Sequence, residues 1–289
     1  MSQFLIAADS CSDLPLDFVI EHDITIIPML FHFKQEAFLN YPDQREITNR
    51  AFYDRLRDKQ VAKTSQINPK DFIAAIEPFV KEGNDVLVVT LSSLLSGSYN
   101  SMVIGRQELL EKYPDRKIII VDSLLASLGE GFLIYQAVLA RKEGKSIEET
   151  GAFLESIKLK DCALFTVDEL GTLQRGGRIS LTKAIFGSFL NMKPILKIDD
   201  SGRLVPFAKA RGRKNAISIL LETFDNKLQD ERAVFISHAD NPDEAENVRN
   251  EILKRHPNIG TIVVGEIGPI IGAHTGPGTI AIFFLGDQR

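Results

Sequence analysis

The chain of 289 residues lacks several features that mark large classes of protein. It has no tryptophan and only two cysteines, Cys11 and Cys162, too few for a disulfide framework or a structural zinc site. No apolar run is long enough to span a bilayer, and the N-terminus enters a strand-like run without the basic segment of a signal peptide. We therefore expect a soluble, cytoplasmic protein.

Familiar catalytic and nucleotide-binding signatures are also absent. The patterns GxSxG, GxGxxG, GxxxxGK[ST], HExxH and CxxC do not occur. The net charge of −5 argues against a general nucleic-acid binder, so we expect no nucleic-acid partner. A hydrophobic fraction of 44% and a charged fraction of 25% are ordinary for a globular protein of one large or two average domains.

Short apolar runs alternate with helical patterns through the first half of the chain. Residues 4–8, 86–90 and 117–121 read as buried strands, and this alternation predicts a parallel sheet covered by helices on both faces. We expect one further strand over 24–33, with Pro28 at an edge or bulge. Strand-like runs on both sides of the turn 199–202 predict antiparallel pairing in the second half. The prediction is an α/β fold of two domains, 1–158 with the parallel sheet and 159–289 with a mixed or antiparallel sheet.

Polar turns stand at the predicted strand ends, at 9–13, 64–66, 92–101 and 122–123. Such turns share one edge of a parallel sheet, where α/β folds bind ligands. Asp9 with Asp13 favours a helix cap over a metal site, since no other acidic ligand lies near in sequence. The turn after residue 90 contains five serines and leads into a helix. One or two of these hydroxyls are expected to cap that helix, and the others suit an anion such as a phosphate or a carboxylate.

Two regions of the second half complete the candidate chemistry. The stretch 175–214 carries ten basic residues and only two acidic ones, a charge distribution suited to an acidic or phosphorylated partner or to a solvated face. The glycine-dense stretch 265–278 contains His274 and Thr275 between Gly272 and Gly276, which we expect to lie outside any regular helix. If His274 faces the hydroxyl clusters, it supplies a donor or a positive charge to an anion.

Three functions remain open at this level. A site rich in hydroxyls and poor in acids suits the binding of an anionic head group. A Ser/His-dependent esterase or acyl-phosphate hydrolase would assemble Ser96, His274 and Asp122 in space. A phosphosugar or nucleotide binder is the third.

A set of motifs spread over almost the whole chain resembles the DegV family. The motifs are DSxSD (9–13), TSQ (64–66), SSxLSGxYxS (92–101), LxRGGRI (173–179), LNxKPIL (190–196), KxRGRKxA (209–216) and GAHTGPG (272–278). The resemblance implies two α/β domains with a long-chain fatty acid between them as the ligand, and no cofactor. It also implies a bacterial carrier, not catalytic by itself, that presents the carboxylate to an ATP-dependent fatty acid kinase subunit. The carrier then takes the acyl phosphate towards phospholipid synthesis, a role compatible with transient contact with a membrane surface.

The resemblance also suggests roles for individual residues. Those assigned to ligand binding are Thr64, Ser65, Ser93, Ser96, His274, Thr275 and Arg175. Those assigned to the kinase partner are Arg178, Arg211 and Arg213. A fatty acid also needs an apolar slot, for which the candidates are Phe165, Ile185, Phe186, Phe189, Leu190, Ile195 and Phe283. Ser98 and Ile67 depart mildly from the usual motifs, and neither departure removes a proposed ligand residue.

Overall fold

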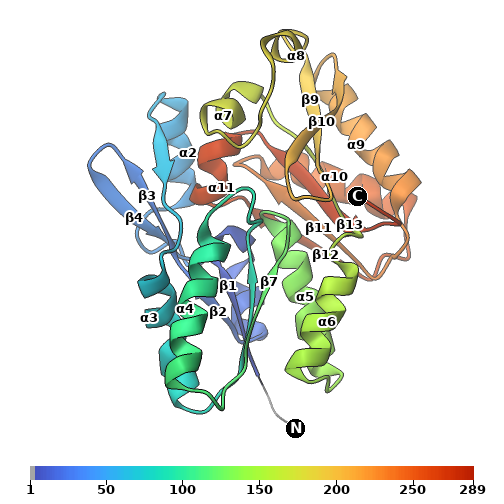
Figure 1. Ribbon diagram of the computed structural model, residues 1–289. Helices are drawn as coiled ribbons and strands as arrows, with labels where there is room; N and C mark the ends of the chain where they lie inside the picture. Colours follow the sequence, from blue (N-terminus) through green and yellow to red (C-terminus); the bar gives the residue numbers. More distant parts are fainter. Residues whose placement is uncertain (1–3) are drawn as a thin grey trace.

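The computed structural model describes residues 4–289 and contains a four-stranded parallel sheet built from the first half of the chain (Figure 1). Its strand order is β2 (Ile24–Ile27), β1 (Leu5–Asp9), β6 (Val86–Thr90) and β7 (Ile118–Asp122). All three pairings are parallel, as the sequence predicts. The four strands therefore end at one edge of the sheet, where their connecting loops meet.

Helices cover both faces of this sheet. They are α3 (Pro69–Lys81) and α4 (Ser98–Lys112) on one face, and α5 (Leu128–Lys142) and α6 (Ile147–Ile157) on the other. Alternate residues of β6 divide between the faces: Val86 and Val88 pack in the cluster with α3 and α4, and Leu87 and Val89 pack with α5 and α6. A strand buried on both faces needs apolar residues throughout, and β6 reads Val-Leu-Val-Val-Thr.

The predicted single strand over 24–33 is two strands in two different sheets. β2 ends at Ile27, and after Pro28 the chain turns into β3 (Met29–Phe33). β3 forms a small antiparallel sheet with β4 (Glu36–Asn40) and β5 (Ala62–Thr64). Pro28 has no N–H to donate to a ladder, so the proline marks the change of sheet rather than a bulge within one strand. α1 (Leu16–Glu21) precedes β2, and α2 (Asn49–Arg57) lies between β4 and β5.

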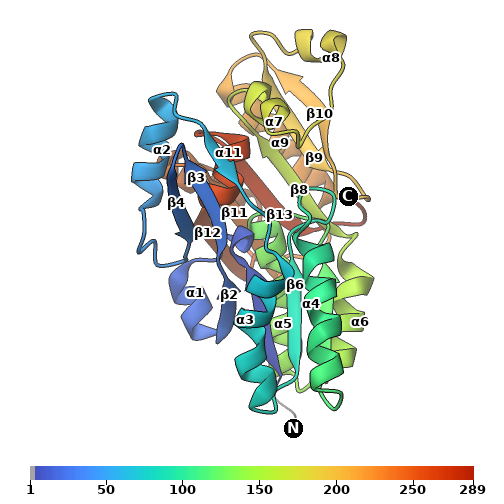
Figure 2. The same cartoon turned by 60° about the vertical axis from the view of Figure 1, so that its left-hand side comes forward.

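A six-stranded mixed sheet contains the strands of the second half (Figure 2). In order they are β10 (Leu204–Ala210), β9 (Lys193–Ile198), β8 (Asp161–Thr166), β13 (Ile280–Leu285), β11 (Ala233–His238) and β12 (Thr261–Glu266). β11 and β12 are parallel, and the other pairings are antiparallel, including the predicted β9–β10 hairpin. The division at residues 158 and 159 therefore separates the strands of the two large sheets, and we retain it as the proposed domain boundary.

The two halves share a core through α5. Helices α9 (Arg213–Lys227) and α10 (Pro242–Arg255) cover one face of the mixed sheet, and α5 contacts its other face. The ring centroids of Phe132 on α5 and Phe235 on β11 are 5.3 Å apart with the rings edge to face. A single apolar cluster thus runs from the parallel sheet through α5 to the mixed sheet. This continuous packing fixes the two sheets relative to each other.

Three further helices are short: α7 (Leu170–Arg175), α8 (Lys183–Gly187) and α11 (Pro269–Thr275). α7 and α11 contact each other, whereas α8 lies at the far end of the mixed-sheet half (Figures 1 and 2). The expectation that His274 and Thr275 lie outside a regular helix is wrong, because both belong to the last turn of α11. Pro269 occupies its first turn, and Gly276 (φ 77°) ends it. Gly272 lies inside this helix because a side chain there would collide with Tyr53. No helix within residues 4–289 is long and apolar enough to cross a membrane.

Candidate functional site

The polar turns at the strand ends meet, as the sequence predicts. The Asp9 carboxylate accepts the Leu91 N–H at 2.9 Å, and the Asp122 carboxylate accepts the Ser93 N–H at 3.1 Å. Asp9 also caps the short 3₁₀ helix that follows β1 by accepting the Cys11 N–H, whereas the helix that begins after Pro15 has no side-chain cap. No cluster of His, Cys, Asp or Glu within residues 4–289 is arranged to hold a metal ion. These carboxylates therefore connect the loops to one another.

The five serines after β6 have different tasks. Ser92 donates to the Gly202 carbonyl at the tip of the β9–β10 hairpin, and thereby links the two halves. Ser98 accepts the Ile67 N–H, and Ser101 accepts from the Gln66 amide. The Ser96 hydroxyl is 2.9 Å from that of Ser98 and accepts the Ser98 N–H, so it provides the expected helix-start contact. The cap position itself is Gly97, which has no side chain to contribute.

Thr64 and His274 face each other across the site. The Thr64 hydroxyl at the end of β5 is 2.9 Å from Nε2 of His274 on α11. Burial lowers the pKa of His274 to about 4, and the nearby Arg178 guanidinium acts in the same direction. Its Nδ1 is buried and has no partner among residues 4–289. The imidazole is therefore neutral near pH 7, so Thr64 and His274 present uncharged donors and acceptors.

A cavity of about 210 Å³ opens beside this pair, and we call it the central cavity. Its polar lining includes Thr64, Ser65, Gln66, Ser96, Gly97, Ser127, Arg178, His274, Thr275 and Thr279. Its apolar lining includes Met29, Leu91, Leu95, Phe165, Leu173, Ile198, Leu204, Ile267, Ile270, Ile271, Ala281 and Phe283. Both halves of the chain contribute to each group. Polar groups on several loops beside an apolar interior suit an amphipathic ligand.

Five of the seven residues assigned to ligand binding and two of the seven apolar candidates line this cavity. They are Thr64, Ser65, Ser96, His274 and Thr275, with Phe165 and Phe283 from the apolar set. Ser93 does not line it, and its backbone N–H donates to the Asp122 carboxylate. Ser127 was missed, although it follows β7 on the same sheet edge and donates to Asp13 at 2.6 Å. Gln66 and Gly97 lie inside the quoted motifs, so the motifs located more of the site than the selected residues did.

The other apolar candidates lie outside the cavity. Ile185, Phe186 and Leu190 are 45%, 36% and 76% exposed on and beside α8, and the partly buried Phe189 packs against the core. Ile195 on β9 is buried against α9 on the opposite face of the sheet. Residues of a strand alternate between faces, so Ile198, an odd number of positions away, lines the cavity instead. The selection of Ile195 therefore failed because its side chain lies on the wrong face of β9.

The two arginines of the RGGR motif do not lie where we expect them: Arg178, and not Arg175, lines the cavity. Arg175 is exposed, and its guanidinium donates to the Thr172 hydroxyl at 3.2 Å. Arg178, assigned to the partner, lines the cavity and donates to the Leu95 carbonyl at 3.2 Å and the Gly176 carbonyl at 2.6 Å. Burial lowers the pKa of Arg178, but an arginine remains charged. The positive charge beside the cavity is therefore that of Arg178.

The proposed Ser–His–Asp set is not assembled. No hydrogen bond joins Ser96 to His274 in the described chain, since Ser96 contacts Ser98 and Nε2 of His274 contacts Thr64. The Asp122 carboxylate accepts the N–H groups of Ser93 and Leu124. A nucleophile needs a base within hydrogen-bonding reach, and the base an orienting group. The geometry therefore favours binding of a head group over attack on it.

Comparison with known proteins relates almost the whole chain to one family. A model of the DegV family of uncharacterised proteins matches residues 3–287. The chain belongs to the DegV family. A DegV domain-containing protein of Clostridium perfringens is 43% identical over 100% of this chain and 99% of its own.

Solved DegV structures have the same fold. A DegV family protein from Thermus thermophilus, described as fatty acid binding, superposes with a TM-score of 0.88 at 29% identity, covering 98% of this chain and 99% of its own. A Thermotoga maritima protein, whose structure is described as revealing a fatty acid binding function, gives 0.86 at 30% identity over 99% and 100%. The two-sheet α/β architecture is thus that of the DegV family.

Proposed function

We propose that this protein binds one long-chain fatty acid in the central cavity. The observation that carries the proposal is the cavity itself, which combines an apolar interior with a cluster of neutral donors and one arginine. Thr64, Ser96 and His274 would hydrogen-bond the carboxylate, with Thr275 beside them and Arg178 supplying the opposite charge. Fatty acid binding by the Thermus and Thermotoga relatives supports this ligand class.

The lining of the cavity indicates which groups would provide the affinity and which would orient the ligand. Each methylene moved from water to an apolar environment contributes about 0.8 kcal/mol, so the hydrocarbon tail would provide most of the affinity. Phe165, Leu173 and Phe283 are among the side chains that would surround it. The polar groups would fix which end of the ligand reaches the surface, where Thr64, Ser96 and His274 are each partly exposed.

Native mass spectrometry of the protein as purified from cells tests this function. We expect the intact mass to exceed that of the chain by one fatty acid, and delipidated protein to take up oleate in a one-to-one ratio. A mass equal to that of the chain alone, with no uptake of oleate, would refute the proposal. Turnover of acyl esters that is lost in Ser96→Ala would instead support the esterase alternative.

We further propose that the bound acid is the substrate of a separate ATP-dependent kinase subunit, as the family resemblance implies. In that reaction a carboxylate oxygen attacks the γ-phosphorus of ATP, ADP leaves, and the acyl phosphate stays on this carrier for use in phospholipid synthesis. The partial exposure of the polar end is compatible with such access. Loaded protein mixed with a purified kinase subunit and ATP should give an acyl phosphate that hydroxylamine traps as a hydroxamate. Absence of the hydroxamate with a kinase active on another carrier would exclude this role.

The α8 region supports transient contact with a membrane surface, from which a fatty acid would be exchanged. Exposed Ile185, Phe186 and Leu190 lie beside the exposed Lys183, an arrangement of apolar and basic side chains suited to the surface of an anionic bilayer. The segment extends from the rest of the molecule in both views (Figures 1 and 2). Leu190→Ser should reduce co-sedimentation with vesicles that contain anionic phospholipid without reducing oleate affinity in detergent-free buffer. Equal co-sedimentation of both proteins would remove this contact from the proposal.

A further inference from the structure

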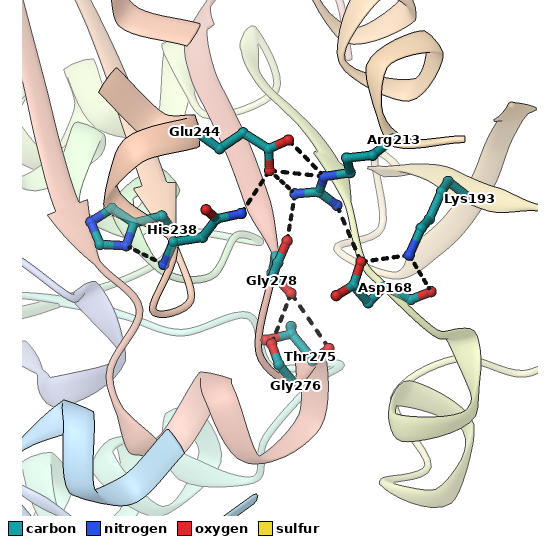
Figure 3. Close-up of polar contacts among 10 residues, drawn as sticks. Asp168, Lys193, Arg213, His238, Glu244, Thr275, Gly276 and Gly278 are labelled. Atoms are coloured by element: carbon teal, nitrogen blue, oxygen red, sulfur yellow. Dashed lines mark hydrogen bonds and ion pairs between the residues drawn. The ribbon is translucent and has the colours of Figure 1, made fainter. Parts of the chain in front are cut away.

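Arg213, the first residue of α9, is directed into the molecule. Its Nε lies 3.0 and 2.8 Å from the two carboxylate oxygens of Glu244 on α10, and Nη2 donates to Glu244 and to the Gly278 carbonyl (Figure 3). Its side chain is 21% exposed, whereas the neighbouring Arg211 is exposed and forms no ion pair within residues 4–289. The two arginines of one motif therefore face different surroundings.

The Gly278 carbonyl belongs to the short segment that connects α11 to β13. Gly276 and Gly278 both have positive φ, 77° and 81°, and the Gly278 N–H donates to the Ala239 carbonyl at 2.8 Å. The Thr279 hydroxyl donates back to the carbonyl of Gly276 at 3.1 Å. This segment directly follows His274 and Thr275, so whatever holds it also sets the end of α11 (Figure 3).

Arg213 also reaches the chain that leads into α7. Its Nη1 is 3.8 Å from the Asp168 carboxylate, which Lys193 binds at 2.6 Å. Asp168 lies over Gly278 so closely that a Cβ on that glycine would be 2.4 Å from the carboxylate oxygen. Two basic and two acidic groups thus form one neutral cluster that joins α9, α10, β9, the start of α7 and the end of α11 (Figure 3).

α7 and α11 contact each other at the polar end of the central cavity. We call this end, with Thr64, Ser96, Arg178, His274 and Thr275, the head-group site. A Cβ at Gly176, directly after α7, would be 2.4 Å from Nδ1 of His274, so the imidazole lies against the backbone of the RGGR motif. The same Gly176 carbonyl accepts from Arg178. The relative placement of α7 and α11 therefore decides the distance between His274 and Arg178.

We infer that Arg213 is a positioning residue of the head-group site, which holds the ends of α7 and α11 together and so places His274 and Thr275. This assignment replaces its expected role in kinase binding and leaves Arg211 as the surface residue of that motif. It rests on the proposed function in so far as the positioned groups would bind a carboxylate.

The test compares Arg213→Gln with the matched surface variant Arg211→Gln. Affinities for oleate and for oleyl alcohol, which has the same tail and no carboxylate, separate the head-group site from the tail cavity. We expect Arg213→Gln to lower oleate affinity about tenfold and alcohol affinity less than twofold. Arg211→Gln should change neither. An unchanged ratio of the two affinities in Arg213→Gln, or equal effects of both substitutions, would overturn the inference.

A second measurement needs no ligand and keeps the inference testable if the wild-type protein fails to bind oleate. The ring ¹⁵N resonances of His274, assigned by comparison with His274→Gln, report its hydrogen bond to Thr64 directly. Arg213→Gln should shift these resonances and Arg211→Gln should not, whereas unshifted resonances in Arg213→Gln would contradict the inference. If Arg213→Gln does not fold, Arg213→Lys, which keeps the charge but lacks the planar fork, should show the same effects at a smaller size.

Discussion

Among the described residues that line the central cavity, Arg178 is the one with a positively charged side chain. The other polar side chains of the lining are hydroxyls, the Gln66 amide and the neutral imidazole of His274. A carboxylate leaving water for this site would replace its hydration with several fixed dipoles and one ion pair. Such a set offsets the desolvation of a single anionic group, and without the ligand Arg178 keeps its hydrogen bonds to the Leu95 and Gly176 carbonyls.

Arg178 and Arg175 offer a matched pair of substitutions in one motif. We expect Arg178→Met to lower oleate affinity about tenfold, because a partly buried charge next to a carboxylate is lost. Arg175→Met should leave the affinity within twofold, since Arg175 is exposed outside the lining. Isothermal titration of the delipidated proteins gives both values. The reverse order of effects would show that Arg175 is the arginine that reaches the head group.

The lowered pKa of His274 predicts how stability depends on pH in the ligand-free protein. The folded state holds this pKa at about 4, below the ordinary histidine value of 6.5, so the unfolded chain takes up the proton first as pH falls. The contribution of His274 to the free energy of unfolding is fully present above pH 6.5. It is lost progressively between pH 6.5 and 4, by at most about 3 kcal/mol.

The variant His274→Gln lacks this titration. Its free energy of unfolding, measured with urea, should therefore fall less than that of the wild type between pH 7.5 and pH 4. Parallel pH profiles for the two proteins would mean that His274 is not buried as described.

At the scale of helices and strands, the regular alternation of the first half made its parallel sheet predictable. β6 follows directly from its run of apolar residues, and α3 begins with Asn68 as its cap and Pro69 in its first turn, an arrangement typical of helix starts. The errors arose where tertiary contacts overrule local preference. α11 is flanked by Gly268 and Gly276 and contains Gly272, which disfavours a helix, yet it forms because Gly272 allows it to approach α2 closely. The sequence cannot reveal such an approach before the partner helix is placed.

Gly272 and Gly187 test this explanation. A Cβ at Gly272 would be 2.5 Å from the Tyr53 hydroxyl and 3.0 Å from the Phe52 ring, whereas a Cβ at Gly187 in α8 meets nothing within 4 Å. We expect Gly272→Ala to destabilise the protein by about 1–3 kcal/mol and to weaken oleate binding through the displaced α11. Gly187→Ala should be neutral or slightly stabilising in urea unfolding. A Gly272→Ala protein as stable as the wild type would show that α11 does not depend on this contact.

At the scale of the whole molecule, Arg289 joins segments from both halves. Its guanidinium donates to backbone carbonyls of Ser123, Leu124, Lys158, Asp161 and Asp199, and its side chain is 6% exposed. These carbonyls lie in the turn after β7, on both sides of the proposed domain boundary and directly after β9. A motif search does not find this residue, because its partners are backbone groups brought together only by the folded chain.

Arg289→Ala should therefore lower the free energy of unfolding by about 3 kcal/mol or more, since several buried carbonyls lose their donor. The exposed Arg203 provides the control, and Arg203→Ala should change the stability by less than about 0.5 kcal/mol. Urea unfolding of the full chain measures both. Equal stability of the two variants would show that water replaces the Arg289 contacts without cost.

The crystal structure of the protein with oleate tests the central claim most directly. The account predicts one chain in the central cavity, with its carboxylate within hydrogen-bonding distance of Thr64, Ser96 and His274 and its tail against Phe165 and Phe283. Oleate bound elsewhere, or inserted with its methyl end at Thr64 and His274, would contradict it.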